Sequence, residues 1–226
     1  MKNVVTFLLI FVSSFVFSQN SFNVTSQSVG VNTSFSVEIG LENTSEVTAF
    51  QFDLSHNESA YELLSGSTLT SRAENHILSV STVDETTIRV IVFSSSNEVI
   101  SIGTGAILNL NFVSNNEPGI YGLSMSDIVL SDQNGAALSV SSTGGNVTIL
   151  GPQYDLVTTA VNFGEIPLNS TQQQSVNVSN TGNQDLIISS YSIDAPFSLI
   201  DALPVTIPAG NSRSFSVSVD TSNKQV

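Results

Sequence analysis

The chain has 226 residues, a formal net charge of −14 and no cysteine. Ser, Thr and Asn supply 79 residues and charged residues only 11%, which excludes a coiled coil and favours strands joined by polar turns. Five basic residues against 19 acidic ones exclude nucleic acid and anionic membrane surfaces as partners, and the lack of cysteine excludes disulfides and thiolate metal sites.

Residues 1–18 are typical of a secretory signal peptide. Lys2 provides a basic start, residues 4–12 are apolar except for Thr6, and Ser18 is a small residue before the predicted cleavage site. The apolar stretch is shorter than the roughly 20 residues that a membrane-spanning helix needs. We therefore expect a secreted or cell-surface protein with no membrane insertion after signal cleavage.

The segment 19–150 alternates apolar and polar residues with the period of two that half-buried strands show. Strands are expected at residues 35–41, 50–54, 88–93, 107–112 and 146–150, separated by turns at 42–44, 115–119, 132–135 and 144–146. The run 88–93 is apolar at both parities, which predicts a strand in the interior of its sheet. No helical period extends over three turns, so the segment is predicted to be an antiparallel β-sandwich.

Gly151-Pro152 marks the expected boundary, because proline cannot donate to a strand ladder and tends to end a strand. Beyond it, strands are expected at residues 157–163, 175–179, 186–193, 197–199 and 212–219. A seven-stranded sandwich usually needs about 100 residues. The segment 151–226 is therefore predicted to be a second sandwich that lacks its last one or two strands.

Four stretches of the first segment resemble the cohesin domain, the receptor half of the cohesin–dockerin pair. They are residues 29–37 (VGVNTSFSV), 47–54 (VTAFQFDL), 105–112 (GAILNLNF) and the closing segment 127–150. Asn57-Glu58 departs from the pattern, because cohesins often have Asp-Pro at this point. The resemblance implies a jelly-roll sandwich whose flat sheet face docks a helical partner. Dockerin is the implied candidate, with Ca²⁺ required by that partner rather than by this chain.

Residues 153–226 resemble a Hydin-type immunoglobulin-like domain, the kind repeated in large bacterial surface proteins. The stretches that carry this resemblance are residues 161–166 (VNFGEI), 178–186 (VSNTGNQDL), 195–197 (APF) and 207–210 (IPAG). The resemblance implies a spacer. The predicted fold class is thus all-β with two tandem antiparallel β-sandwiches. A cohesin-like jelly roll occupies residues 19–150 and an incomplete Ig-like sandwich residues 151–226.

The candidate partner-binding residues are polar side chains expected on one outward sheet face. They are Gln51, Asp53, Arg89, Asn109 and Asn111. Gln51 and Asp53 have the outward parity of the strand 50–54, and we expect the strands that carry the other three to flank it in the same sheet. Alternation fixes which residues point outward but not which are used, so a solvated face without a partner stays open as an alternative.

No set of residues predicts catalysis, a cofactor or a metal site. His56 and His76 are the only histidines, and we expect both on the surface or in loops. The stretch Asp132-Gln133-Asn134-Gly135 resembles the start of a Ca²⁺ loop, but Thr143 stands at the twelfth position, where such a loop requires Glu. A hairpin turn is therefore predicted at residues 132–135.

The favoured interpretation is a non-catalytic extracellular module for protein binding, adhesion or scaffolding, with a dockerin-like partner held on a sheet face. Two alternatives stay open. Polysaccharide binding by the same sandwich is weakened by the absence of Trp and the presence of only four Tyr, because sugars stack on exposed aromatic rings. A passive surface stalk would bind no ligand at all.

Overall fold

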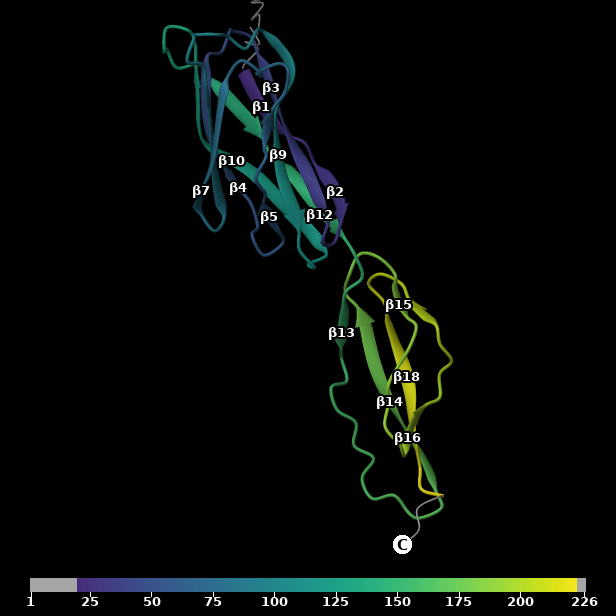
Figure 1. The fold of residues 1–226 in the computed structure, drawn as a ribbon. Coiled ribbons are helices and arrows are strands. Elements are labelled where there is room, and N and C mark those ends of the chain that lie inside the picture. Colours follow the sequence, from purple (N-terminus) through teal and green to yellow (C-terminus); the bar gives the residue numbers. More distant parts are fainter. Residues whose placement is uncertain (1–19, 223–226) are drawn as a thin grey trace, which may run out of the picture.

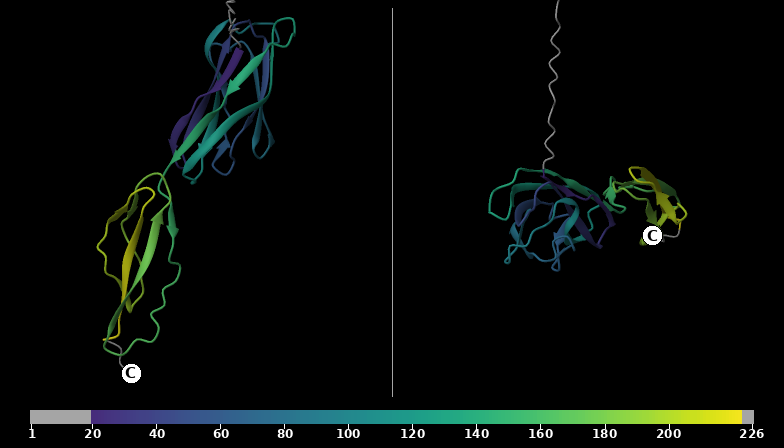
Figure 2. Two further views of the ribbon diagram at one scale, coloured as in Figure 1. Left: turned by 180° about the vertical axis from the view of Figure 1, so that it is seen from behind. Right: turned by 90° about the horizontal axis from the view of Figure 1, so that it is seen from above.

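The computed structural model of the protein describes residues 20–222, and the signal peptide predicted at residues 1–18 lies outside them. The described part contains 18 strands and no helix, which confirms the predicted all-β fold class. It forms two units that lie end to end (Figure 1), and the same arrangement is seen from behind in Figure 2. Within residues 20–222 there is no helix that could cross a membrane.

The N-terminal unit, residues 20–150, is built from two six-stranded sheets. One sheet has the order β11-β1-β3-β9-β5, with β6 also paired to β9, and the other has the order β2-β12-β10-β4-β8-β7. The strands are β1 Asn20–Val24, β2 Gln27–Gly30, β3 Ser34–Asn43, β4 Ala49–Ser55, β5 Tyr61–Leu63, β6 Thr68–Leu69, β7 Ile77–Asp84, β8 Thr87–Phe93, β9 Gly103–Ser114, β10 Gly119–Ser131, β11 Val140–Thr143 and β12 Gly145–Leu150.

The five strands predicted in this unit are confirmed as parts of β3, β4, β8, β9 and β12. Strand β8 lies between β4 and β7, as its apolar composition predicted for an interior strand. The alternation also placed the core side chains correctly. Phe50, Phe52 and Leu54 of β4 are buried, whereas the residues between them belong to the outer face of the sheet.

The core of the N-terminal unit lies between the two sheets and is rich in aromatic rings. The ring of Phe22 lies 5.3 Å from that of Phe50 and 5.6 Å from that of Phe52, so β1 and β4 meet across the sandwich. Phe112 of β9 packs edge-on against the buried ring of Tyr61, at 5.5 Å. Each large side chain removed from water in this way contributes about 1.5–3 kcal/mol. This packing has to stabilise the unit without disulfides, since the chain has no cysteine.

The first and last strands of the unit run parallel and change sheets at the same level. Strand β1 pairs with β11 in one sheet, and β2 pairs with β12 in the other. Gly144 and Gly145 lie where the chain passes from β11 to β12. A Cβ on Gly144 would lie 2.4 Å from the Leu123 carbonyl oxygen, and a Cβ on Gly145 would lie 2.6 Å from the Val24 carbonyl oxygen. Only glycine fits this close backbone approach. The turn predicted at residues 144–146 is therefore a crossing between sheets.

The C-terminal unit, residues 152–222, has a four-stranded sheet of order β13-β14-β18-β16 and a two-stranded sheet of β15 and β17. The strands are β13 Tyr154–Leu156, β14 Thr171–Asn180, β15 Leu186–Ile188, β16 Phe197–Leu199, β17 Val205–Ile207 and β18 Ser212–Asp220. Its buried apolar residues are Val178, Val205, Ile207 and Phe215. An apolar groove of about 200 Å³ stays open over β14, β16 and β18.

Two strand predictions for this unit are wrong, one entirely and one in extent. Residues 157–163, predicted as a strand, form an irregular connection that runs from β13 to the start of β14 (Figure 1). The N–H groups of Val157 and Thr158 both donate to the Asn177 carbonyl, and beyond this point no neighbouring strand pairs with the segment. The strand predicted at 186–193 ends at Ile188, and β17 was not predicted. A sequence that alternates apolar and polar residues forms a strand only where a neighbouring strand supplies hydrogen-bond partners for its backbone N–H and C=O groups.

A short set of hydrogen bonds joins the two units. The Asn183 side chain donates from Nδ2 to the Ile149 carbonyl at 2.8 Å and accepts at Oδ1 from the Gly151 N–H at 2.9 Å. Its own N–H donates to the Gly151 carbonyl at 3.1 Å. A Cβ on Gly182 would lie 2.4 Å from that same carbonyl oxygen, so this position needs glycine. The Asn-Thr-Gly-Asn stretch of the second unit therefore holds the end of β12.

Both histidines lie in loops, as expected, but neither is on the surface. His56 follows β4 and His76 precedes β7, and they are 9% and 8% exposed. The His56 ring lies 6.0 Å from the ring of Tyr61 and 6.2 Å from that of Phe112. Burial lowers the pKa of both imidazoles, because it penalises the charged form.

Stability is expected to decline as the pH falls from 7.5 to 5.5. The unfolded chain takes up protons on both imidazoles below about pH 6.5, while the lowered pKa keeps the folded form neutral. The contribution of each imidazole to the free energy of unfolding is therefore fully present above about pH 6.5. Below that pH it falls by up to about 1.4 kcal/mol per pH unit, until the lowered pKa of the folded form is reached. Urea unfolding measured at several pH values tests this. A variant with His56→Gln and His76→Gln should lose most of the slope, and an unchanged slope would contradict the assignment.

Asn183→Ala is expected to loosen the connection between the units without unfolding either, because it removes two of the hydrogen bonds at the junction. Small-angle X-ray scattering should give a broader distance distribution than the parent protein gives. Asn162→Ala, an exposed residue whose side chain accepts only a local bond from Gly164, is the matched control. Equal distributions for the two variants would show that the Asn183 bonds do not fix the arrangement.

Candidate functional site

The outer face of β10, β4, β8 and β7 is the strongest candidate for a binding site. Strand register places its side chains in rows across the sheet. Ala49 of β4 lies opposite Phe93 of β8, which lies opposite Ile77 of β7. The next row places Gln51 between Val129 of β10 and Ile91 of β8. The third row pairs Asp53 with Arg89 and Arg89 with Ser81.

Four apolar side chains from three strands occupy the first two rows of this face. We call Ile77, Ile91, Phe93 and Val129 the apolar stripe. Ile77, Phe93 and Val129 are 46%, 40% and 52% exposed, although each lies on a regular strand. Single exposed apolar residues are normal, but Ile77, Ile91 and Phe93 adjoin on β7 and β8. Val129 is separated from Ile91 by Gln51. This arrangement is typical of a protein-binding face.

An ion pair flanks the stripe. Arg89 donates from Nε to Asp53 Oδ1 and from Nη2 to Asp53 Oδ2, both at 2.7 Å. The Asp53 side chain is 6% exposed and that of Arg89 is 39% exposed, so the guanidinium covers the carboxylate. The two hydrogen bonds with Arg89 lower the pKa of Asp53 against the opposing effect of burial, and Asp53 raises the pKa of Arg89 in turn.

A bulge in β10 brings a second carboxylate to this pair. The register between β10 and β4 shifts between Ser126 and Val129, and Asp127 has a φ of 49°. The negative charge of Asp127 lies close enough to the guanidinium to help raise the pKa of Arg89. Bulges redirect side chains in this manner. The third row of the face is therefore a compact group of charged residues beside the apolar stripe.

The expectation that all five predicted residues share one sheet face is wrong. Gln51, Asp53 and Arg89 lie together on β4 and β8, but Asn109 and Asn111 belong to β9 of the opposite sheet. Asn109 lies opposite Glu38, and the Asn111 side chain donates from Nδ2 to the Gly66 carbonyl at 2.8 Å. Outward parity was correct for these residues. The sheet predicted for Asn109 and Asn111 was wrong, because the parity of a residue carries no information about which strand becomes the neighbour of its own strand.

The two outer faces of the unit differ in chemistry. The outward residues on β3 and β9 opposite each other are polar, namely Ser36, Glu38, Asn109 and Asn111. The apolar stripe has no counterpart in this central part of the β3–β9 face. The sequence contained one signal for this difference, since the run 88–93 is apolar at both parities and so places Ile91 and Phe93 outward. Sequence reasoning used that signal for strand position alone and missed the stripe.

The remaining polar candidates have structural partners. Asp132 Oδ1 accepts from the N–H groups of Asn134 and Ala136 at 2.8 and 2.9 Å, which lowers the pKa of Asp132 and closes the loop predicted there. The Arg72 guanidinium donates to the carbonyls of Leu41 and Gly103. Residues 20–222 contain no group of three or more His, Asp or Glu that could hold a metal ion.

Comparison with solved structures shows that the N-terminal unit has the fold of cohesin domains. A cohesin–dockerin complex from Clostridium thermocellum matches with a TM-score of 0.54 at 14% identity, covering 59% of this chain and 100% of that chain. A non-cellulosomal cohesin from the archaeon Archaeoglobus fulgidus matches with a TM-score of 0.52 at 18% identity, covering 59% and 93%. The cohesin of Clostridium acetobutylicum in solution matches with a TM-score of 0.50 at 19% identity, covering 58% and 90%.

The second unit matches a family model. Residues 152–225 match the HYDIN/CFA65/VesB-like, Ig-like domain. No curated protein matches the chain. The two resemblances predicted from the sequence, cohesin for the first unit and Hydin-type Ig-like for the second, are thus confirmed at the level of fold and of family model.

Arg89→Gln is expected to make the protein more sensitive to acid. Arg89 lowers the pKa of Asp53, so the stability that this carboxylate contributes is present above its ordinary pKa and is lost only as the pH falls through the lowered value. Without the guanidinium, Asp53 protonates at higher pH and acid unfolding should begin earlier. Circular dichroism between pH 6 and pH 2 measures this.

The matched control for that variant is Glu85→Gln in the exposed turn between β7 and β8, which makes no ion pair among the described residues. Its acid unfolding should follow that of the parent protein. If Arg89→Gln behaves like this control, the ion pair does not contribute to the stability of the face.

Proposed function

We propose that the N-terminal unit is a non-catalytic protein-binding module that captures a partner on the outer face of β10, β4, β8 and β7, outside the cell. The observation that carries this proposal is the apolar stripe. It lies in the rows next to the hydrogen-bonded pair of Asp53 and Arg89, on the same rigid sheet. Interfaces combine an apolar centre with polar groups at the rim, and this face has both.

The rigidity of the face favours affinity. Strands β8 and β10, which carry three of the four residues of the stripe, are hydrogen-bonded on both sides, and the inward side chains of β8 are fully buried. A partner would therefore bind without ordering a loop, and the entropy cost of association stays small. Phe93 is the largest exposed side chain of the stripe, and aromatic anchors dominate the binding energy of many interfaces.

The partner we propose is dockerin-like. Some of the solved cohesins that share the fold were determined in complex with dockerins, and this supports the same class of partner here. Residues 20–150 contain nine Glu and four Asp against two Arg, so a partner with a basic docking surface would be steered toward the unit. The Ca²⁺ dependence of such binding would belong to the partner.

The second unit then acts as a spacer after export of the protein. Hydrogen bonds between Asn183 and the end of β12 support this role, because they hold the binding unit on the C-terminal unit. The spacer role and the extracellular location both belong to the proposal.

Phe93→Asp is expected to weaken partner binding at least about tenfold, because it places a charge in the centre of the stripe. The mature chain would be immobilised and titrated with a panel of recombinant dockerin modules by surface plasmon resonance, with and without a chelator. Asn109→Asp on the opposite outer face is the matched control and should bind like the parent protein.

Three outcomes would contradict the proposal. If no dockerin module binds saturably, the likeness to cohesins is one of fold alone. Equal losses in the Phe93 and Asn109 variants would place the binding site elsewhere. Competition by soluble polysaccharide, with no effect of the chelator, would replace the protein partner with a carbohydrate.

A further inference from the structure

A second feature of the N-terminal unit lies at its open side, where the edge of one sheet faces the edge of the other. Strand β7 is the last strand of its sheet and pairs only with β8. Strands β5 and β6 form the corresponding edge of the other sheet. The two edges do not meet, and a pocket of about 360 Å³ lies between them.

The edge of β7 is unprotected by the usual means. Its eight residues contain no proline and no charge before Asp84, and its register is regular up to Thr82. Native edge strands are normally short, charged, bulged or covered, because their free N–H and C=O groups pair readily with other strands. The other edge strands of the unit follow this rule by length, since β2 and β11 have four residues, β5 three and β6 two.

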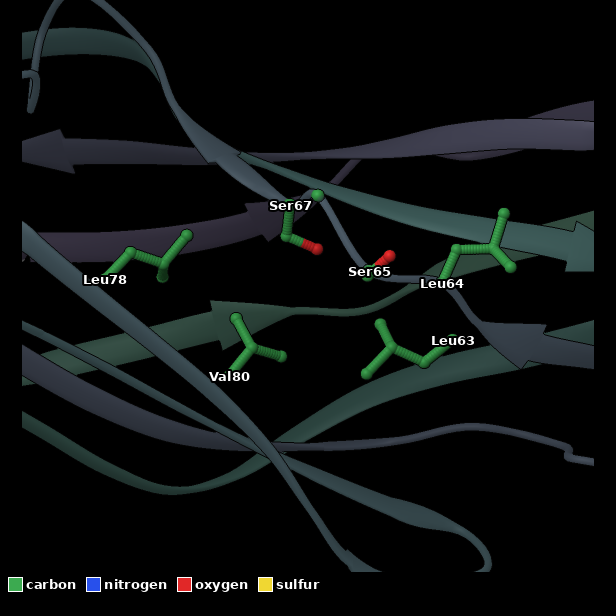
Figure 3. Close-up of a pocket in the computed structure, with 7 residues that line it drawn as sticks. Leu63, Leu64, Ser65, Ser67, Leu78 and Val80 are labelled. Atoms are coloured by element: carbon green, nitrogen blue, oxygen red, sulfur yellow. The ribbon is translucent and has the colours of Figure 1, made fainter.

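The pocket beside this edge presents side chains at strand spacing. Figure 3 shows Leu78 and Val80 pointing from β7 toward the segment that follows β5. That segment contributes Leu64, Ser65 and Ser67, and β5 contributes Leu63. Leu78 and Val80 have the inward parity of β7, and both are half-buried rather than closed off by other side chains. No charged residue lines the pocket.

We propose that β7 accepts an additional strand, namely an extended and uncharged peptide segment of a partner protein with branched aliphatic residues at alternate positions. A strand that pairs with the free edge of β7 continues the sheet, so its alternate side chains point to the same side as Leu78 and Val80. They would enter the pocket. The main-chain hydrogen bonds supply affinity and the pocket supplies selectivity, which is the mode of recognition called strand addition.

The chemistry of the pocket selects this occupant. A Lys, Arg, Asp or Glu side chain entering it would lose its hydration without an ionic partner, which is costly. Acidic peptides are also repelled by the thirteen carboxylates of residues 20–150. The hydroxyl groups of Ser65 and Ser67 tolerate a Thr or Ser beside the aliphatic residue. A helical partner would leave the main-chain groups of β7 unpaired, so it fits this edge less well than it fits the outer face.

This site is independent of the docking face proposed above. The pocket is formed by inward residues of β7 and by the segment 63–67, whereas the apolar stripe is formed by outward residues. Ile77 is the only residue of the stripe on β7, and it does not line the pocket. Failure of dockerin-like binding would therefore leave strand addition untouched, and the reverse also holds.

The experiment uses the full mature chain and a panel of capped octapeptides in which Val, Ile or Leu alternates with Thr or Ser. Binding is followed by amide chemical shifts and amide hydrogen exchange. We expect saturable binding, with slowed exchange and shifted signals in β7 and in residues 63–67. Peptides with proline at two consecutive central positions should not bind, because one of the two prolines then replaces an N–H group that pairs with the edge.

Ser65→Trp is expected to weaken binding at least about tenfold by filling the pocket. Ser71→Trp, an equally exposed serine in the loop between β6 and β7 that does not line the pocket, is the matched control and should bind like the parent protein. If Ser65→Trp fails to fold, Leu64→Arg serves the same purpose, because Leu64 is 37% exposed and lines the pocket.

Several results would overturn the proposal. One is that no peptide of the panel binds saturably at concentrations up to about 1 mM. A Kd of that size corresponds to a binding free energy of roughly −4 kcal/mol. Another is binding that both tryptophan variants leave unchanged, or shifts confined to Phe93 and Val129. Sedimentation of the free chain as a dimer that Ser65→Trp dissociates would show that the occupant is a second copy of the chain and would replace the partner peptide.

Discussion

The packing of one face of each sheet against the other is the constraint on which the N-terminal unit depends. The chain has no cysteine, so the apolar side chains between the sheets have to hold twelve strands together. Phe22, Phe50, Phe52 and Phe112 are buried there. Because each strand must direct one set of alternate residues into this core, the other set is forced outward. The chemistry of both outer faces follows from this division.

The outward set includes exposed apolar residues in the centre of one face only. On β4 and β8 it combines Gln51, Ile91 and Phe93 with the ion pair of Asp53 and Arg89, while the central outward residues of β3 and β9 are polar. The ion pair permits an acidic residue to lie almost fully covered next to apolar neighbours, since Arg89 donates a hydrogen bond to each oxygen of the carboxylate. The proposed docking face is therefore held in one conformation before a partner arrives.

The two units differ in how completely they bury their apolar residues. The first closes its core between two six-stranded sheets, and a pocket lies beside the edge strand β7. The second covers a four-stranded sheet with only β15 and β17, and Tyr191 and Leu199 line a groove that stays open. Alternation predicted the strands of the first unit better for this reason. Residues 157–163 alternate in the same manner as true strands, yet no neighbouring strand pairs with them.

The sequence by itself determined the all-β class, the positions of five of the twelve strands of the first unit, and the outward parity of the candidate residues. These properties are local, because the side-chain period of two depends only on the backbone conformation of one strand. Only the tertiary structure decided which strands became neighbours. It placed Asn109 on the opposite sheet from Gln51, brought Asp127 to the ion pair through a bulge, and left β7 at an edge. Pairing joins residues far apart in the chain, and it is selected by the packing of the whole core.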